Sequence, residues 1–178
     1  MGQVITRFSN CSGLNTEEDL KNIENSIQRA LPVMYREICL QCDYGVPEKY
    51  DITYFDNLLD SYNVTCIGTF LSLKPLSTNS CQEKLLENYY TPPEGFEEGL
   101  ITFAVDPFGN YFCFDYRQDP KTENPPVVFW NHEGAGTEQA VSYLAKDFEA
   151  FLDMLKSEEE AEAEYQRLKA EHGNPPEE

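Results

Sequence analysis

The sequence predicts an α+β domain with N-terminal helices, a central, mainly antiparallel sheet, and a C-terminal helix that extends into an acidic tail. Two observations predict this class. Apolar residues at helical spacing occur at the two ends of the chain, and strand-like apolar runs separated by turn residues fill the middle. We expect a single domain over residues 1–157 and a helical tail over residues 158–178.

Two helices joined at a Leu-Pro corner are predicted at the start of the chain. Thr16 precedes a run of acidic residues, and this order is typical of a helix N-terminus because the acids suit its positive end. Pro32 suits the first turn of the second helix, which should stop near Gly45. The apolar residues expected to face the core are Leu20, Ile23, Ile27, Ala30, Met34, Tyr35, Ile38, Cys39 and Cys42.

The middle of the chain predicts an antiparallel sheet. Asp106 to Asn110, with Pro, Gly and Asn together, is a strong turn signal between two strands, and the second of these strands is apolar on both faces. A short helix is expected between residues 80 and 90. The predicted strands are Val64 to Leu73, Leu100 to Val105, Tyr111 to Tyr116, and Val127 to Asn131.

Helical spacing returns near the C-terminus. Asp147 is a candidate cap, and Phe148, Phe151, Leu152 and Leu155 form one apolar stripe. Beyond Ser157 the residues favour a helix but few are apolar. We therefore expect a solvated helical extension there.

The chain is strongly acidic throughout. Residues 157–178 hold eight glutamates against Arg167 and Lys169, a net of −6, so residues 1–156 carry −13 of the total of −19. Such a field repels nucleic acid and anionic membranes and speeds encounter with a basic partner. Solubility alone is the competing explanation of the charge.

No secretory signal or membrane-spanning run is recognisable, so the sequence predicts a cytoplasmic protein. The six cysteines, Cys11, Cys39, Cys42, Cys66, Cys81 and Cys113, are then expected to be reduced thiols. The opening MGQVIT also fits the myristoylation pattern, which is short and often occurs by chance.

No segment carries recognisable catalytic chemistry. Cys39 and Cys42 have redox-motif spacing but lie late in a helix, where the dipole is unfavourable, so they are interpreted as buried structural thiols. His132 has no nucleophile motif beside it. Asp106, Asp115 and Asp119 are the acids that could form a metal cluster. Asp106 and Asp115 flank a hairpin turn, which would place them near each other, but turn or strand-end duty explains both without a metal. We predict neither an enzyme nor a metal or cofactor site.

The order of these elements resembles the SUKH superfamily, which is named for a yeast cell-wall regulator. The resemblance runs from about Asp19 to Leu155, and the chain departs from the family at Gly45, where a second Gly is usual, and at Asp147, where Ser is usual. The matching elements are Leu31-Pro32, Tyr35, Phe103-Ala104-Val105-Asp106, Gly109-Asn110, Asp115, and the closing Leu144, Ala145, Phe148, Phe151 and Leu152.

The resemblance implies a binding protein. Members of the superfamily are best known as bacterial immunity proteins that neutralise a toxin, often a nuclease, and the alternative is a regulatory scaffold similar to the yeast protein. We expect a monomer or weak homodimer that binds a basic toxin and no nucleic acid or membrane. From their position on loops around the sheet, the candidate contact residues are Asp106, Asp115, Tyr116, Asp119, Trp130, His132 and Glu133. A place in the core is the alternative for Trp130.

Overall fold

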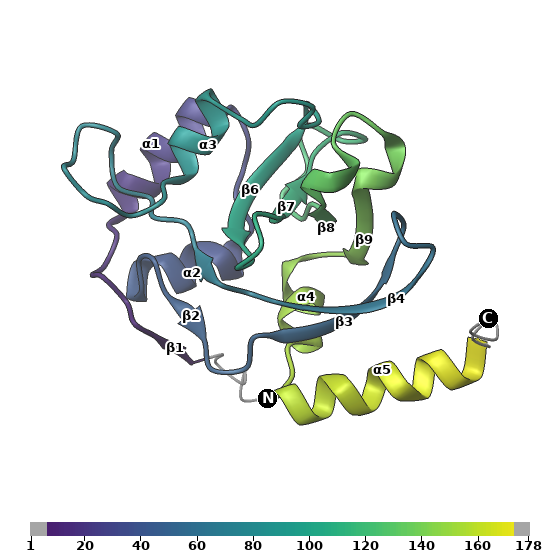
Figure 1. Cartoon of the computed structure of the whole chain (residues 1–178). Coiled ribbons are helices and arrows are strands. Elements are labelled where there is room, and N and C mark those ends of the chain that lie inside the picture. Colours follow the sequence, from purple (N-terminus) through teal and green to yellow (C-terminus); the bar gives the residue numbers. More distant parts are fainter. Residues whose placement is uncertain (1–6, 173–178) are drawn as a thin grey trace.

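The computed structural model describes residues 7–172 and confirms the α+β class. At its centre lies a five-stranded antiparallel sheet in the order β5-β6-β7-β8-β9 (Figure 1). In chain order, the helices and strands are β1 (Phe8–Ser9), α1 (Glu17–Ile27), α2 (Val33–Gln41), β2 (Val46–Pro47), β3 (Asp51–Asp56), β4 (Ser61–Cys66), β5 (Thr69–Phe70), α3 (Leu85–Tyr90), β6 (Leu100–Val105), β7 (Tyr111–Asp115), β8 (Val127–Trp130), β9 (Val141–Ala145), α4 (Phe148–Met154) and α5 (Glu158–His172).

Helices α1, α2 and α4 bury one face of this sheet. The predicted caps form as expected: Thr16 and Asp19 make a reciprocal capping box, and Asp147 accepts a hydrogen bond from the Ala150 N–H. Tyr35 of α2 lies at the centre of the main core, with its ring edge-on to Phe114 at 5.1 Å. Such aromatic contacts add to the energy of burial itself.

The opposite face of the sheet is also covered. Trp130 stacks on Tyr111 at 5.3 Å and meets Phe96, in the loop between α3 and β6, at 5.1 Å. Ala140, at the end of the short 3-10 turn Glu138–Ala140, and Ala135, which follows the 3-10 turn His132–Gly134, complete this second cluster. Because β7 and β8 have apolar cover on both sides, their side chains are apolar on both faces, as predicted for residues 111 to 116.

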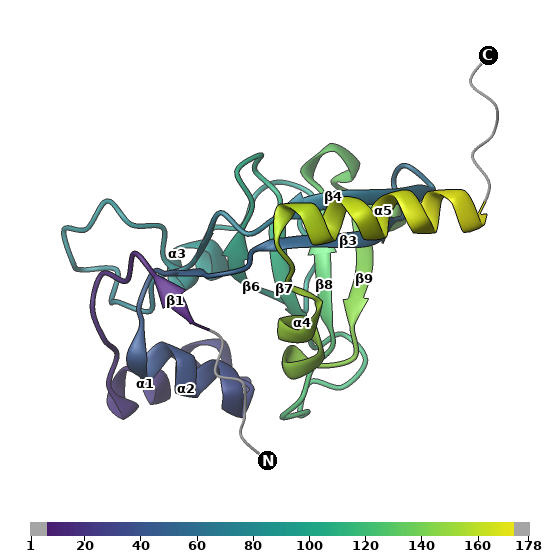
Figure 2. The ribbon, with the colours of Figure 1, turned by 90° about the horizontal axis from the view of Figure 1, so that it is seen from below.

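A hairpin of β3 and β4 lies between the sheet and α5 (Figure 2). Side chains alternate along β3, so Tyr54 faces the sheet while the Thr53 hydroxyl donates to the Ala161 carbonyl of α5 at 2.8 Å. Ala161 is fully buried. The expectation of a solvated helical extension is therefore wrong on this side of α5, because the helix packs on the hairpin.

One predicted strand divides in two. Residues 64–73 were expected to be continuous, but the chain leaves the hairpin after β4 and enters the sheet at β5. Gly68 lies at this crossing and passes close to β6: a Cβ there would lie 3.1 Å from the Val105 carbonyl oxygen, which is tighter than ordinary van der Waals contact. Strands β3 and β9 were not predicted.

The helix expected from residue 80 begins only at Leu85. The segment before it is held extended, because Ser72 donates its N–H to the Glu83 carbonyl and accepts from the Leu85 N–H. Lys84 is buried there, and its ammonium donates to the Thr78 carbonyl at 2.8 Å.

The expectation of six reduced thiols is wrong for two cysteines. Cys11 and Cys42 form a disulfide with a Cα–Cα distance of 5.1 Å, which ties the N-terminal segment to the end of α2. That helix ends at Gln41, before Cys42 and short of the predicted Gly45. Cys39 is a free, buried thiol, and burial raises its pKa to about 12. The MGQVIT segment lies outside the described residues.

Candidate partner-binding site

The seven predicted contact residues lie in three different places. Asp106, His132 and Glu133 come together at one end of the sheet, beside the β6–β7 turn. Asp115 and Asp119 line a separate hollow beyond the other end of β7. The remaining two, Tyr116 and Trp130, are 0% and 1% exposed and belong to the cores.

The Asp106 carboxylate organises the β6–β7 turn. Its Oδ1 accepts the N–H groups of Phe108 at 2.9 Å and Asn110 at 2.8 Å. Its Oδ2 accepts the Asn110 side-chain amide at 2.9 Å and the Thr65 hydroxyl at 3.2 Å. A carboxylate has about four acceptor positions, so all of those on Asp106 are occupied within the protein.

His132 is oriented by the same turn. Its backbone N–H and its Nδ1 both lie within hydrogen-bond distance of the Asn110 Oδ1, at 3.1 and 2.7 Å. Because that oxygen can only accept, Nδ1 carries a proton and donates to it; in the tautomer protonated at Nδ1 alone, Nε2 is an acceptor. Asn131 caps the short 3-10 turn by accepting the Glu133 N–H.

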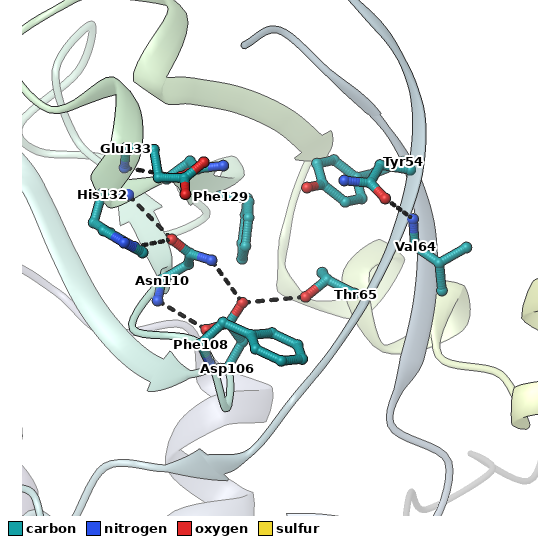
Figure 3. A pocket seen from close by; sticks show the side chains of 11 residues that line it. Tyr54, Val64, Thr65, Asp106, Phe108, Asn110, Phe129, His132 and Glu133 are labelled. Atoms are coloured by element: carbon teal, nitrogen blue, oxygen red, sulfur yellow. Dashed lines mark hydrogen bonds between the residues drawn. The ribbon is translucent and has the colours of Figure 1, made fainter. Parts of the chain in front are cut away.

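A polar cleft of about 500 Å³ opens between these residues and the inner side of the β3–β4 hairpin (Figure 3). We call it the hairpin cleft. Burial raises the pKa of the Tyr54 hydroxyl, which lies on its hairpin side. No lysine or arginine lines it. Its lining residues are Tyr54, Asn63, Val64, Thr65, Asp106, Phe108, Asn110, Phe129, Asn131, His132 and Glu133.

Phe108 is a site feature that the sequence reasoning missed. It lies at the tip of the β6–β7 turn, lines the hairpin cleft and is 70% exposed. The Pro-Phe-Gly order held the signal, because a phenylalanine at the tip of a tight turn has few neighbours to bury it. Thr65, Asn110 and Tyr54 were missed as well.

The second hollow, of about 490 Å³, has a different electrostatic character. Arg117 donates to both oxygens of Asp115, at 2.9 Å each, and to Glu97 at 2.6 Å. These hydrogen bonds, that to Asp115 first, raise the pKa of the guanidinium. Asp115 pairs with Leu100 at the end of the β6–β7 hairpin away from the turn. The expectation that Asp106 and Asp115 lie near each other is therefore wrong.

Tyr116 and Trp130 act in packing. The Tyr116 hydroxyl donates to the Ala30 carbonyl at 2.6 Å and so links the end of the β6–β7 hairpin to the corner before α2. Trp130 is enclosed by Phe96 and Tyr111. Neither side chain presents a surface to a partner in this structure.

The arrangement at the hairpin cleft suits binding. Within residues 7–172, no hydroxyl or thiol donates to the His132 ring, which an activated nucleophile would require. The same part of the chain has no group of three or more His, Cys, Asp or Glu placed to hold a metal ion. None of the described helices is both long enough and apolar enough to cross a bilayer.

Comparison with known proteins gives two matches. The sequence model of the SMI1 / KNR4 family (SUKH-1) matches residues 14–154. The chain is also similar to the SPbeta prophage-derived protein YokK of Bacillus subtilis (strain 168), at 25% identity over 161 residues that cover 82% of this chain and 77% of YokK. Both hollows fall within the matched family residues, whereas α5 follows them.

Proposed function

Because the chain belongs to the SMI1/KNR4 family (SUKH-1), we propose that it is an immunity protein that binds a cognate bacterial toxin domain and neutralises it by occlusion. The family includes proteins associated with toxin partners, and the similarity to a prophage-derived bacterial protein favours this role over that of a eukaryotic regulatory scaffold. The protein would act without catalysis, cofactor or metal.

The observation that carries the proposal is the combination of a net charge of −19 with a cleft that no lysine or arginine lines. A basic nuclease domain would be steered to this surface, because complementary charge raises the rate of encounter. Phe108 would then supply apolar contact area, since exposed aromatic side chains are frequent anchors at protein interfaces. The bound immunity protein would then block the toxin's substrate site sterically.

The proposal places the protein in the cytoplasm, where a nuclease would act. Thiols are kept reduced in that compartment, whereas the structure pairs Cys11 with Cys42. We therefore expect the disulfide to be dispensable for toxin binding, and it lies on a different part of the fold from the hairpin cleft.

The test is a toxicity rescue. The C-terminal domain encoded by the neighbouring toxin gene is expressed in cells with and without this protein, and a pull-down follows. Rescue together with a stable complex is the expected result. Unchanged killing without a complex would reject immunity for that pair and leave the regulatory scaffold as the better reading.

A charge-reversal pair then maps the surface. Glu133→Lys changes the hairpin cleft, and Asp119→Lys makes the same charge change at the second hollow; both residues are exposed. We expect the first variant to slow association and weaken rescue, and the second to behave like the unmodified protein. Equal loss in both would show that only overall charge matters.

A further inference from the structure

We infer that the hairpin cleft receives an arginine side chain of the protein partner. The inference rests on the proposed function for the partner's basic character, and the structure of the cleft supplies the choice of arginine. Three features point to a guanidinium group: a buried charge without a counter-ion, acceptor atoms that remain open, and an exposed aromatic ring at the rim.

The buried charge belongs to Asp106. The residue is 5% exposed, and its four hydrogen-bond donors are neutral groups of Phe108, Asn110 and Thr65. Within residues 7–172 it forms no salt bridge. Buried carboxylates are usually paired with a cation, because an isolated charge is costly in a low dielectric. A cation in the cleft would compensate this charge through space, without displacing the existing hydrogen bonds.

The open acceptors belong to His132 and Glu133. Asn110 holds the Nδ1 side of the His132 ring, and in the tautomer protonated at Nδ1 alone Nε2 is an acceptor. Glu133 lines the cleft, is exposed and adds a second negative charge. Arginine has five N–H donors and no acceptor, so it matches a cleft that offers acceptors and negative charge.

The aromatic ring is that of Phe108. It is 70% exposed although it lines the cleft, so one side of the ring is available to a ligand. A guanidinium stacks on aromatic rings and is more weakly hydrated than an ammonium group, which favours arginine over lysine at such a rim.

The second hollow lacks these features. It contains a cation of its own, Arg117, whose charge is already matched by Asp115 and Glu97. It is therefore a natural internal control for a charge-driven ligand.

The experiment titrates the isotope-labelled full chain with N-acetyl-arginine methylamide and follows the backbone amide signals by NMR. The neutral citrulline analogue and the lysine analogue serve as ligand controls. We expect arginine to shift the amide signals of Phe108, His132 and Glu133, with weaker shifts from lysine and none from citrulline. Absence of these shifts, equal shifts with citrulline, or shifts centred on Arg117 would overturn the inference, and equal shifts with lysine would overturn the choice of arginine.

Variants assign the contacts. Phe108→Leu should weaken arginine binding about two- to fivefold through loss of the cation–π contact. Glu133→Gln should weaken it by a similar factor of about two to five, as for an exposed ion pair. Asp119→Asn, which removes the same charge at the second hollow, should leave the affinity unchanged. If Asp119→Asn weakens binding as much as Glu133→Gln, the site is wrongly placed.

The titration and the toxicity rescue fail independently. Arginine binding without rescue would support the hairpin cleft as an arginine-binding site and reject the tested toxin as its partner. Rescue without arginine binding at the cleft would support immunity and reject this mode of recognition.

Discussion

Thr65 on β4 donates a hydrogen bond of 3.2 Å to Asp106, the residue that organises the β6–β7 turn. The bond joins the β3–β4 hairpin to the five-stranded sheet across the hairpin cleft, and both residues are buried. Asp106 therefore fixes the cleft from beneath, and it is not available as a direct contact for a partner.

Replacement of Thr65 by valine tests this link. Valine keeps the shape but removes the donor, so one acceptor position on a buried carboxylate loses its partner. We expect Thr65→Val to lower the free energy of unfolding by about 1.5–3 kcal/mol, the range for hydrogen bonds to charged groups. Urea denaturation measures the change. Thr65→Ser keeps the hydroxyl and is the control. If Thr65→Val loses no more stability than Thr65→Ser, the hydrogen bond to Asp106 does not account for the loss.

The Cys11–Cys42 disulfide closes a loop with a sequence separation of 31 residues. A cross-link of that span restricts the unfolded chain and is worth about 3–4 kcal/mol in the loop-entropy model. We expect the Cys11→Ala/Cys42→Ala double variant to lose stability of this order in urea denaturation. Cys81→Ala removes an exposed free thiol and should have no effect. A double variant as stable as the unmodified chain would contradict the loop-entropy account.

Two buried thiols make stability fall at alkaline pH. Burial raises the pKa of Cys39 and of Cys113 to about 12 from an ordinary value of 9.0. Between pH 9 and 12 the unfolded chain loses these protons while the folded chain keeps them. The stabilising effect is thus complete below pH 9 and is lost as pH rises toward 12.

Each thiol should steepen the loss by up to about 1.4 kcal/mol per pH unit in this interval. The measurement compares urea denaturation at pH 8 and pH 10 for the unmodified chain and for Cys113→Ala. The variant should show the shallower decline. An identical decline would mean that Cys113 ionises alike in the folded and unfolded states.

Sequence reasoning found the elements whose signals are local. Thr16 and Asp147 cap their helices as expected, and the turn from Asp106 to Asn110 joins β6 to β7. These features depend on neighbours in the chain, so residue order is enough to predict them. The family resemblance, over about residues 19–155, is confirmed by the family match over 14–154.

Features set by distant neighbours were missed. β3 has buried residues on both of its faces because α5 covers its outer side, so it lacks a clear alternation of polar and apolar positions. The Cys11–Cys42 pairing depends on where the N-terminal segment meets the end of α2. Asp106 and His132 lie close together because Asn110 hydrogen-bonds to both side chains. Asp115 lies far from Asp106, because in the register of β6 and β7 it pairs with Leu100 at the end away from the turn.

Ala161 controls the packing of α5. It is fully buried against the hairpin, where its carbonyl accepts the Thr53 hydroxyl. Ala161→Glu introduces a charged side chain into a space that holds a methyl group, and we expect a loss of about 1–3 kcal/mol, as for overpacked sites. Hydrogen exchange should accelerate throughout α5. Ala163→Glu, on the exposed side of the same helix, is the matched control, and equal exchange in both variants would show that α5 is not held by this contact.

A chain that ends at Ser157 tests the predicted domain boundary. The main core extends to Leu155 and contains no residue of α5, so its apolar contacts survive the truncation. The truncated chain loses the Ala161 contact and the ion pairs of Lys49 with Glu160 and Lys156 with Glu164, which are only partly shielded from solvent. We expect cooperative thermal unfolding at a lower midpoint, with the near-ultraviolet circular dichroism of the aromatic core retained. A chain without a cooperative transition would show that α5 is an integral part of the domain and that its boundary lies beyond residue 157.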